Sequence, residues 1–334
     1  MELIGFIVLL VLGIAAIIFD RIEILKYLYI PLLFSFMVIV RLNAFVFNAF
    51  EIDIITYGLE MKAYSFDIYY LREFVFWFGI RILYFITQSE LVAFLLLDIL
   101  WIYLLYKVSR KVSVNKIGNT LLIILATCFP FFFGYQNIYR QFFATIVLLY
   151  SYSIIDDRSN RSIFFFFVSI FIHNLSLLIL PLFIIKKFFT FKLNDRLVLS
   201  SVLVAIYLLV LPSILSLKDG DDPTKIDLSI LYMVLFIFLF LFYIYKFRDN
   251  ILNFILIVPS LIPATLLTIG FVAYRQEMIA ERLGMMFIPF IIFDIYNYSL
   301  LIQSSFKRKL LQLFLLLLFS VPVLLFTSSL MFLD

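Results

Sequence analysis

Long uninterrupted runs of apolar residues, separated by short polar loops, fill most of the chain. The runs are continuously apolar rather than alternating, and unpaired backbone groups cannot lie in lipid, so the pattern predicts helices rather than a membrane barrel. A helix needs about 20 such residues to cross a bilayer, which leaves room for about ten to twelve crossings. The apolar runs are 3–19, 27–47, 74–88, 91–107, 118–135, 138–155, 162–185, 197–216, 227–246, 251–274, 281–303 and 310–331.

For two of these runs the pattern does not decide whether the segment crosses the bilayer once. The run 74–88 is short and carries Arg81, which favours an interfacial or re-entrant helix. The run 162–185 has basic loops at both ends, so it is either a broken hairpin with His173-Asn174 at its tip or one ordinary span. The pattern as a whole predicts an all-α polytopic membrane protein. Residues 1–334 are expected to form a single integral membrane domain with one long external polar insert, 48–73.

Composition supports the membrane assignment and excludes several other classes. The 334 residues are 65% hydrophobic and 14% charged, whereas a soluble domain is about 45–50% apolar and about 25% charged. The net charge of +4 is small and scattered, which argues against a nucleic-acid partner. One cysteine and one histidine exclude a disulfide within the chain and a multi-histidine or thiolate metal site. No phosphate-binding glycine loop or metal motif is present, so we expect no metal and no cofactor.

The distribution of Lys and Arg predicts the orientation of the loops. The acidic or mixed loops 48–73, 135–139, 217–227 and 275–282 are expected outside, and the basic loops in the cytoplasm. The basic loops carry Arg21 and Lys26; Lys107, Arg110, Lys111 and Lys116; Arg158 and Arg161; Lys186, Lys187, Lys192 and Arg196; Lys246 and Arg248; and Lys307, Arg308 and Lys309.

Polar residues near the expected outer face form the candidate site. Ionisable groups at membrane depth are costly and by default face a cavity or a partner. Several arginines converging on a cavity would suit a pyrophosphate, because the guanidinium binds phosphate through a planar fork and stays charged. The candidates are Arg41, Asp53, Tyr57, Glu73, Arg140, Gln141, His173, Arg275, Glu281 and Arg282.

Structural explanations compete with these functional ones. Arg41 could snorkel at a helix end, and His173 could be a buried hydrogen bonder between helices. Asp98 and Asp294 lie within apolar runs, where each could serve a proton pathway or pair with a neighbouring span.

Several short motifs along the chain, and the order in which they occur, resemble those of the EpsG-type and Wzy-type polysaccharide polymerases. Arg140-Gln141-Phe142-Phe143-Ala144 is similar to the family's "RQ-x-x-A" at the head of a span. With one spacer residue added, His173-Asn174-Leu175-Ser176 is similar to its "H-x-S" element. The order of the remaining motif positions also matches. They are Arg41, Asp53 followed by Tyr57, Glu73 and, heading a late span, Arg282.

The resemblance implies a metal-independent glycosyltransferase of the bacterial cytoplasmic membrane. Donor and acceptor would both be polyprenyl-pyrophosphate-linked oligosaccharides, joined at the outer face of the bilayer, and a chain-length regulator would be a partner. On this hypothesis Arg140, Arg275 and Arg282 hold the pyrophosphate of the donor. His173, or failing that Asp53 or Glu73, removes the acceptor proton. Binding roles are expected for Arg41, Tyr57, Gln141 and Glu281.

Two other functions stay open. A flippase or transporter of lipid-linked sugars would have a similar number of spans, although such proteins often show helices broken at matching positions in two halves. Pro259 and Pro263 break one helix, without a matching pair in the first half. A transferase resembling the O-antigen ligases would share most of the site and differ in its acceptor.

Overall fold

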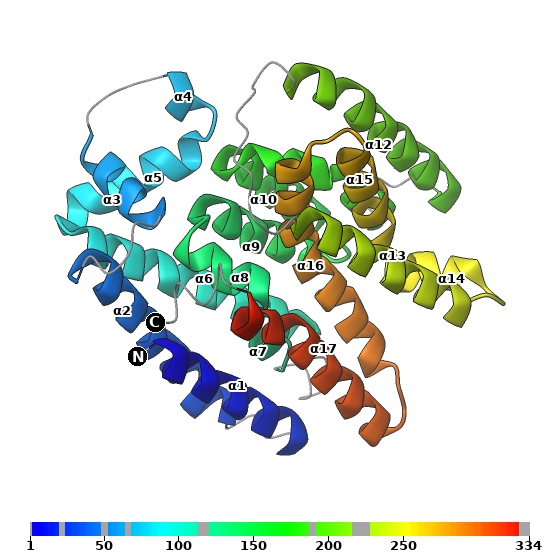
Figure 1. Cartoon of the computed structure of the whole chain (residues 1–334), viewed down its shortest axis with the longest axis horizontal. Helices are drawn as coiled ribbons and strands as arrows, with labels where there is room; N and C mark the ends of the chain where they lie inside the picture. The colour runs from blue at the N-terminus through cyan, green and yellow to red at the C-terminus, as the bar shows by residue number, and fades with distance from the viewer. Residues whose placement is uncertain are drawn as a thin grey trace. The chain divides into compact units, whose positions relative to one another are not determined.

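Helices make up the secondary structure, as the sequence predicts (Figure 1). The computed structural model describes residues 2–19, 24–47, 53–63, 68–112, 120–186, 192–215 and 228–326, and these contain no strand. The chain forms two compact units. The first comprises residues 1–154, 164–174 and 299–334, and the second comprises 155–163 and 175–298. We describe each unit separately, and the single membrane domain expected for the whole chain stays a prediction.

The first unit holds most of the N-terminal helices. They are α1 (Glu2–Phe19), a π-helical segment (Ile24–Tyr29), α2 (Ile30–Phe45), α3 (Asp53–Lys62), α4 (Ile68–Leu71), α5 (Phe74–Thr87), α6 (Glu90–Val112), α7 (Thr120–Thr127), α8 (Phe129–Gln136), α9 (Tyr139–Ile154) and α17 (Ser305–Leu325). Helix α10 (Ser159–Ile172) runs through both units. The second unit holds a 3₁₀ segment (Asn174–Ile179, whose first residue belongs to the first unit), α11 (Leu180–Lys186), α12 (Leu193–Leu215), α13 (Leu228–Lys246), α14 (Ile251–Ile257), α15 (Leu261–Ala273) and α16 (Glu277–Leu300).

Six helices among the described residues are long and apolar enough to cross a membrane, which is typical of a multi-pass membrane protein. A seventh crossing results if α14 and α15, bent by 85° at their junction, form one broken span. This number is below the ten to twelve expected from the apolar runs, because some runs divide into shorter helices. The candidate spans are Glu2–Phe19, Tyr27–Phe45, Glu90–Val112, Leu193–Val210, Leu228–Lys246 and Ser305–Leu325.

The runs that divide do so at identifiable residues. The run 118–135 forms two helices, α7 and α8, separated by Cys128 in an extended conformation. Pro130 lies in the first turn of α8, where its missing backbone N–H costs no hydrogen bond. The run 162–185 is interrupted at His173, which ends α10. The run 74–88 is the 14-residue helix α5, too short to be among the candidate spans.

Helix α6 lies at the centre of the first unit. It packs against α2, α5, α7 and α9, while α1 packs against α2, α7 and α17 (Figure 1). Aromatic side chains fill the interior: the ring of Phe142 meets those of Trp101 and Phe131 edge-on, with centroids 5.3 and 5.1 Å apart. This packing fixes the start of α9 against α6.

The second unit is organised around α15, which packs against α11, α12 and α13. The bend before α15 follows Pro259, as the sequence predicts. Asp294 of α16 is buried at this bend, and its Oδ2 accepts a hydrogen bond of 3.2 Å from the Ser260 backbone N–H. Asp294 therefore binds a backbone group at the broken helix, which explains its place in an apolar run.

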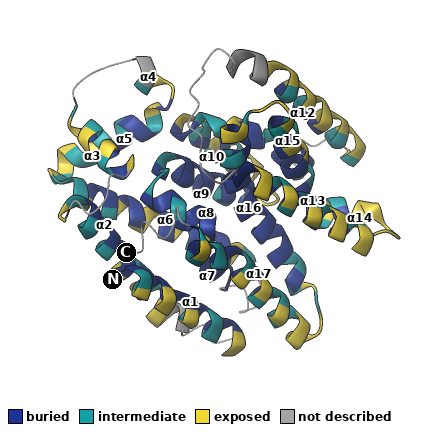
Figure 2. Ribbon diagram, in the orientation of Figure 1, coloured by how far each residue is buried: buried dark blue, intermediate teal, exposed yellow. Residues whose placement is uncertain are grey.

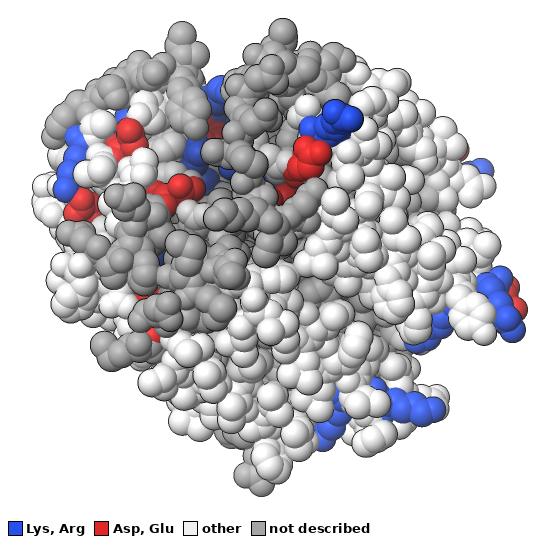
Figure 3. All heavy atoms as spheres, in the orientation of Figure 1, with Lys and Arg blue, Asp and Glu red and all other residues white. Residues whose placement is uncertain are grey.

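Apolar side chains also cover the outside of the helices. On α12, Val198, Val202, Ile206 and Leu209 are exposed, and Figure 2 shows the outer sides of α12 and α13 largely in the exposed colour. Among the described residues visible in Figure 3, charged atoms occupy only small parts of the surface. An apolar exterior of this kind matches a lipid environment.

Close helix packing in the second unit leads to a stability prediction. A Cβ added at Gly284 of α16 would lie 2.5 Å from Cγ of Tyr232 on α13, and 2.9 Å from its Cβ. These atoms are near the backbone of α13, so the two helices have to separate. We expect Gly284→Ala to lower the free energy of unfolding by about 1–3 kcal/mol, measured by thermal unfolding in detergent.

Gly79 of α5 is the matched control, because a Cβ there meets nothing within 4 Å. Alanine favours helix over glycine, so Gly79→Ala is expected to be neutral or to stabilise by up to about 1 kcal/mol. Equal destabilisation by both substitutions would contradict the packing argument.

Candidate functional site

Glu73 is the point where three distant segments of the first unit meet. It precedes the first residue of α5, and its carboxylate is almost fully buried. Oε2 accepts a hydrogen bond from Nη1 of Arg140, at the start of α9. Oε1 accepts from Nδ1–H of His173 at 2.7 Å and from the backbone N–H of Asn174 at 3.2 Å. We call Glu73, Arg140 and His173 the carboxylate cluster.

Arg140 lies between this carboxylate and two aromatic rings. Its Cζ is 4.9 Å from the centroid of Trp77 and 5.3 Å from that of Tyr57. Trp77 comes from the first turn of α5 and Tyr57 from α3, and the two rings meet edge-on. Aromatic faces attract a cation and shield it from water, so they fix the guanidinium without neutralising its charge. The expected role of Tyr57 in orienting substrate stays a prediction.

The ring of His173 is held by the hydrogen bond between its Nδ1 and Oε1 of Glu73. Because a carboxylate oxygen only accepts hydrogen bonds, Nδ1 carries the proton. In the neutral ring the lone pair is then on Nε2, the arrangement that a general base requires. The ring lies where α10 ends and the 3₁₀ segment begins, and it retains 8% exposure.

The charges around Glu73 keep it ionised. Burial alone raises the pKa of its carboxyl group. The hydrogen bond and charge of His173, the charge of Arg140 and the Asn174 N–H together outweigh burial, and the pKa lies below its ordinary value of 4.5. Glu73 lies outside the candidate spans and acts as an anion bound by two basic side chains.

A buried ion pair, Arg41 with Asp98, is connected to the carboxylate cluster through Tyr139. The guanidinium of Arg41 is fully buried and bonds both carboxylate oxygens of Asp98, at 2.7 Å from Nε and 2.9 Å from Nη2. Its Nη1 donates to the carbonyl oxygen of Tyr135 at 2.8 Å. Asp98 also accepts from the hydroxyl of Tyr139 at 3.0 Å, and Tyr139 precedes Arg140 in the chain. These contacts connect Arg41 and Asp98 to the residue before Arg140, and the binding role expected for Arg41 stays a prediction.

The other predicted residues are distributed over both units. Asp53 is exposed at the start of α3, and its backbone N–H donates to the side-chain oxygen of Asn137 at 3.4 Å. Gln141 is buried beside Arg140. Arg275, Glu281 and Arg282 belong to the second unit, Arg275 in a left-handed conformation (φ 55°) before α16 and the other two in α16. Their predicted roles stay predictions, and the loop 217–227 lies outside the described residues.

The candidate residues identified from the sequence did not include Trp77 or Tyr139, and no role was assigned to the Asn174 backbone. Trp77 supports Arg140, the Asn174 backbone binds Glu73, and Tyr139 connects the buried ion pair to α9. Each is next to, or one helical turn from, a residue identified from the sequence. A search for aromatic residues one turn after Glu73 would have found Trp77.

The described residues contain no group of three or more His, Cys, Asp and Glu side chains that could hold a metal ion. No family model matches the chain, and no similarity to a curated protein or a solved structure is found.

Proposed function

We propose that the protein is a membrane glycosyltransferase that polymerises lipid-linked oligosaccharide repeat units. The observation that carries this proposal is the carboxylate cluster, in which one acid joins a histidine and an arginine. Its three residues are also the positions that match the polymerase motifs in the sequence. A histidine oriented by a carboxylate is suited to removing a proton, which transfer to an acceptor hydroxyl requires.

The chemistry begins at the acceptor sugar. Nε2 of His173 takes the proton of an acceptor hydroxyl as that oxygen attacks the anomeric carbon of the donor. The bond from this carbon to the pyrophosphate oxygen breaks, and the lipid pyrophosphate leaves with the electron pair. Glu73 holds the ring in the required tautomer and stabilises the imidazolium that forms.

Arg140 supports the departure of the leaving group. A guanidinium has five N–H donors in a planar fork, which is the geometry that binds phosphate oxygens. Held over Trp77 and Tyr57, it is already positioned where negative charge develops. This proposal rests on residues of the first unit alone.

The finer parts of the proposal follow the motif resemblance. Both substrates are polyprenyl-pyrophosphate-linked oligosaccharides that reach the site from the bilayer. The reaction occurs at the outer face of a bacterial cytoplasmic membrane, and the product is an O-antigen, capsule or exopolysaccharide. A chain-length regulator is the expected protein partner.

The test is gel analysis of surface glycan in cells that lack the native gene and carry wild type, Arg140→Ala or His173→Ala at matched expression. Wild type is expected to give a ladder of many repeats, and both variants a single capped repeat unit, because transfer fails while export continues. A suitable control is Lys62→Gln with Glu90→Gln, which removes an exposed ion pair in the same unit. This control should retain the ladder.

Two results would overturn the proposal. Loss of all surface glycan, with lipid-linked units retained in the cytoplasmic leaflet, would indicate a flippase. Full-length polymer that accumulates on the lipid without reaching its final acceptor would indicate a ligase-type transferase.

A further inference from the structure

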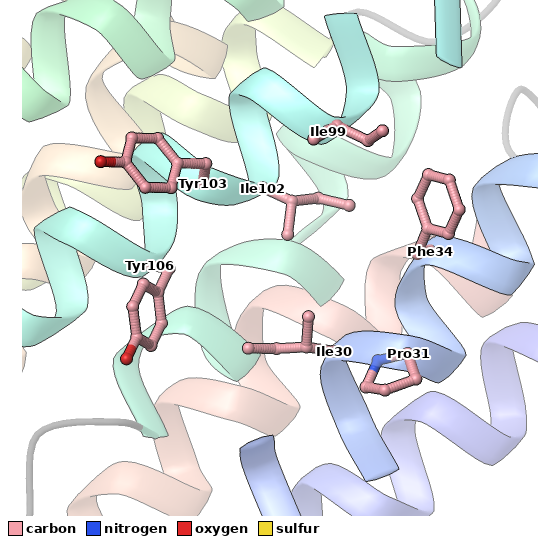
Figure 4. Close-up of a pocket in the computed structure, with 7 residues that line it drawn as sticks. All are labelled: Ile30, Pro31, Phe34, Ile99, Ile102, Tyr103 and Tyr106. Atoms are coloured by element: carbon pink, nitrogen blue, oxygen red, sulfur yellow. The ribbon is translucent and has the colours of Figure 1, made fainter. Parts of the chain in front are cut away.

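An apolar groove opens between α2 and α6 of the first unit (Figure 4). From the first turns of α2 it is lined by Ile30, Pro31 and Phe34, and from α6 by Ile99, Ile102, Tyr103 and Tyr106. Its volume is about 560 Å³, within the range of pockets that hold small ligands. The lining is almost entirely hydrocarbon and aromatic, so the occupant it suits is an apolar chain.

Two cations of α6 contact tyrosines that line this groove. Tyr103 and Tyr106 line it, and each ring stacks with a basic side chain four residues further along α6. Nζ of Lys107 lies 5.1 Å from the centroid of Tyr103, and Cζ of Arg110 lies 5.9 Å from that of Tyr106. The i, i+4 spacing puts these cations on the groove side of the helix. The site therefore combines the apolar groove with the positive charges of Lys107 and Arg110.

The position of the groove along the helices indicates one leaflet. It lies at the start of α2 and towards the end of α6, and basic loops flank both of these ends. Basic loops are cytoplasmic by the distribution of Lys and Arg. The groove is thus expected in the cytoplasmic leaflet, where basic pockets between helices bind anionic lipid headgroups.

We infer that this groove binds an anionic phospholipid, with an acyl chain between α2 and α6 and the headgroup phosphate against Lys107 and Arg110. An amphipathic lipid satisfies both parts of the site at once, since its chain covers the apolar lining and its phosphate balances the cations. The inference depends on the membrane location of the chain and is independent of the proposed transferase activity.

Native mass spectrometry of the purified protein tests this inference, with phosphatidylglycerol and phosphatidylcholine of identical acyl chains as probes. Wild type is expected to retain phosphatidylglycerol preferentially. Lys107→Gln with Arg110→Gln is expected to weaken its binding roughly tenfold, because two cations near the headgroup are lost. Ile99→Trp, which fills the groove, should reduce binding of both lipids.

Lys246→Gln with Arg248→Gln is the matched control. These cations also contact aromatic rings near the end of a helix, α13, but those rings, Tyr298 and Tyr245, do not line the groove. Equal retention of the two lipids by wild type, unchanged binding in Ile99→Trp, or an equal loss in the control would overturn the inference. Displacement of the lipid by millimolar inorganic phosphate would also overturn it, since the site would then recognise phosphate without the chain.

Discussion

Substituting asparagine for Asp98 is expected to lower the free energy of unfolding by about 3–5 kcal/mol. The substitution leaves the guanidinium of Arg41 fully buried without its counter-charge, and removing one partner of a buried ion pair is far more damaging than removing both. The Tyr139 hydroxyl and Trp101 Nε1 also lose a charged acceptor. The measurement is thermal unfolding in detergent, together with the amount of protein in the membrane fraction.

Two further variants make this result specific. Arg41→Met with Asp98→Leu removes both charges and is expected to recover most of the stability that Asp98→Asn loses. Lys62→Gln with Glu90→Gln removes a pair whose lysine is about half exposed, and is expected to change stability by less than about 1 kcal/mol. An Asp98→Asn protein as stable as wild type would show that Arg41 has other sufficient partners.

Replacing Glu73 by glutamine is expected to reduce the rate of glycan transfer about 10²–10⁴-fold. Glutamine keeps the size of the side chain, but it removes the negative charge that stabilises protonated His173 and holds Arg140. Because Glu73 acts through His173 and through Arg140, which supports the leaving group, we expect kcat to fall much more than the KM for the donor rises. A large rise in KM with unchanged kcat would assign Glu73 to substrate binding instead.

The same substitution changes the response to acid. The folded-state pKa of Glu73 is lowered, so its contribution to stability is complete above the ordinary value of 4.5. That contribution is lost as the pH falls through the lower, folded-state pKa. Glu73→Gln is therefore expected to flatten this part of the acid unfolding curve. A variant that keeps the wild-type acid sensitivity would show that other carboxyl groups control it.

The sequence was sufficient to predict the helical class, but not which residues contact one another. Glu73, Arg140 and His173 were each identified as polar groups in an apolar chain, yet they are separated by 67 and 100 positions. A continuously apolar run predicts that a helix lies in the membrane. It has no polar stripe to show which face of the helix packs against other helices and which faces lipid. For the same reason Arg41 and Asp98 were both noticed without being recognised as partners.

The number of crossings was difficult to predict for a different physical reason. Hydropathy averages over about 20 residues, whereas a helix is ended by one or two residues. Pro130 and Pro259 are visible breaks in the sequence. The end of α10 at His173 has no proline to mark it, and the basic loops at both ends of the run 162–185 left both a broken hairpin at His173-Asn174 and one ordinary span open. The break is associated with contacts to Glu73 from another segment.

The ion pair between Arg41 and Asp98 also has a consequence for biogenesis. The two residues are 57 positions apart, and a ribosome adds about 5–20 residues per second. For several seconds during synthesis Arg41 therefore has no counter-ion, although an arginine in lipid is costly. Stable integration of α2 consequently depends on the arrival of α6, so the translocon has to retain the early helices or leave them at the interface until Asp98 emerges.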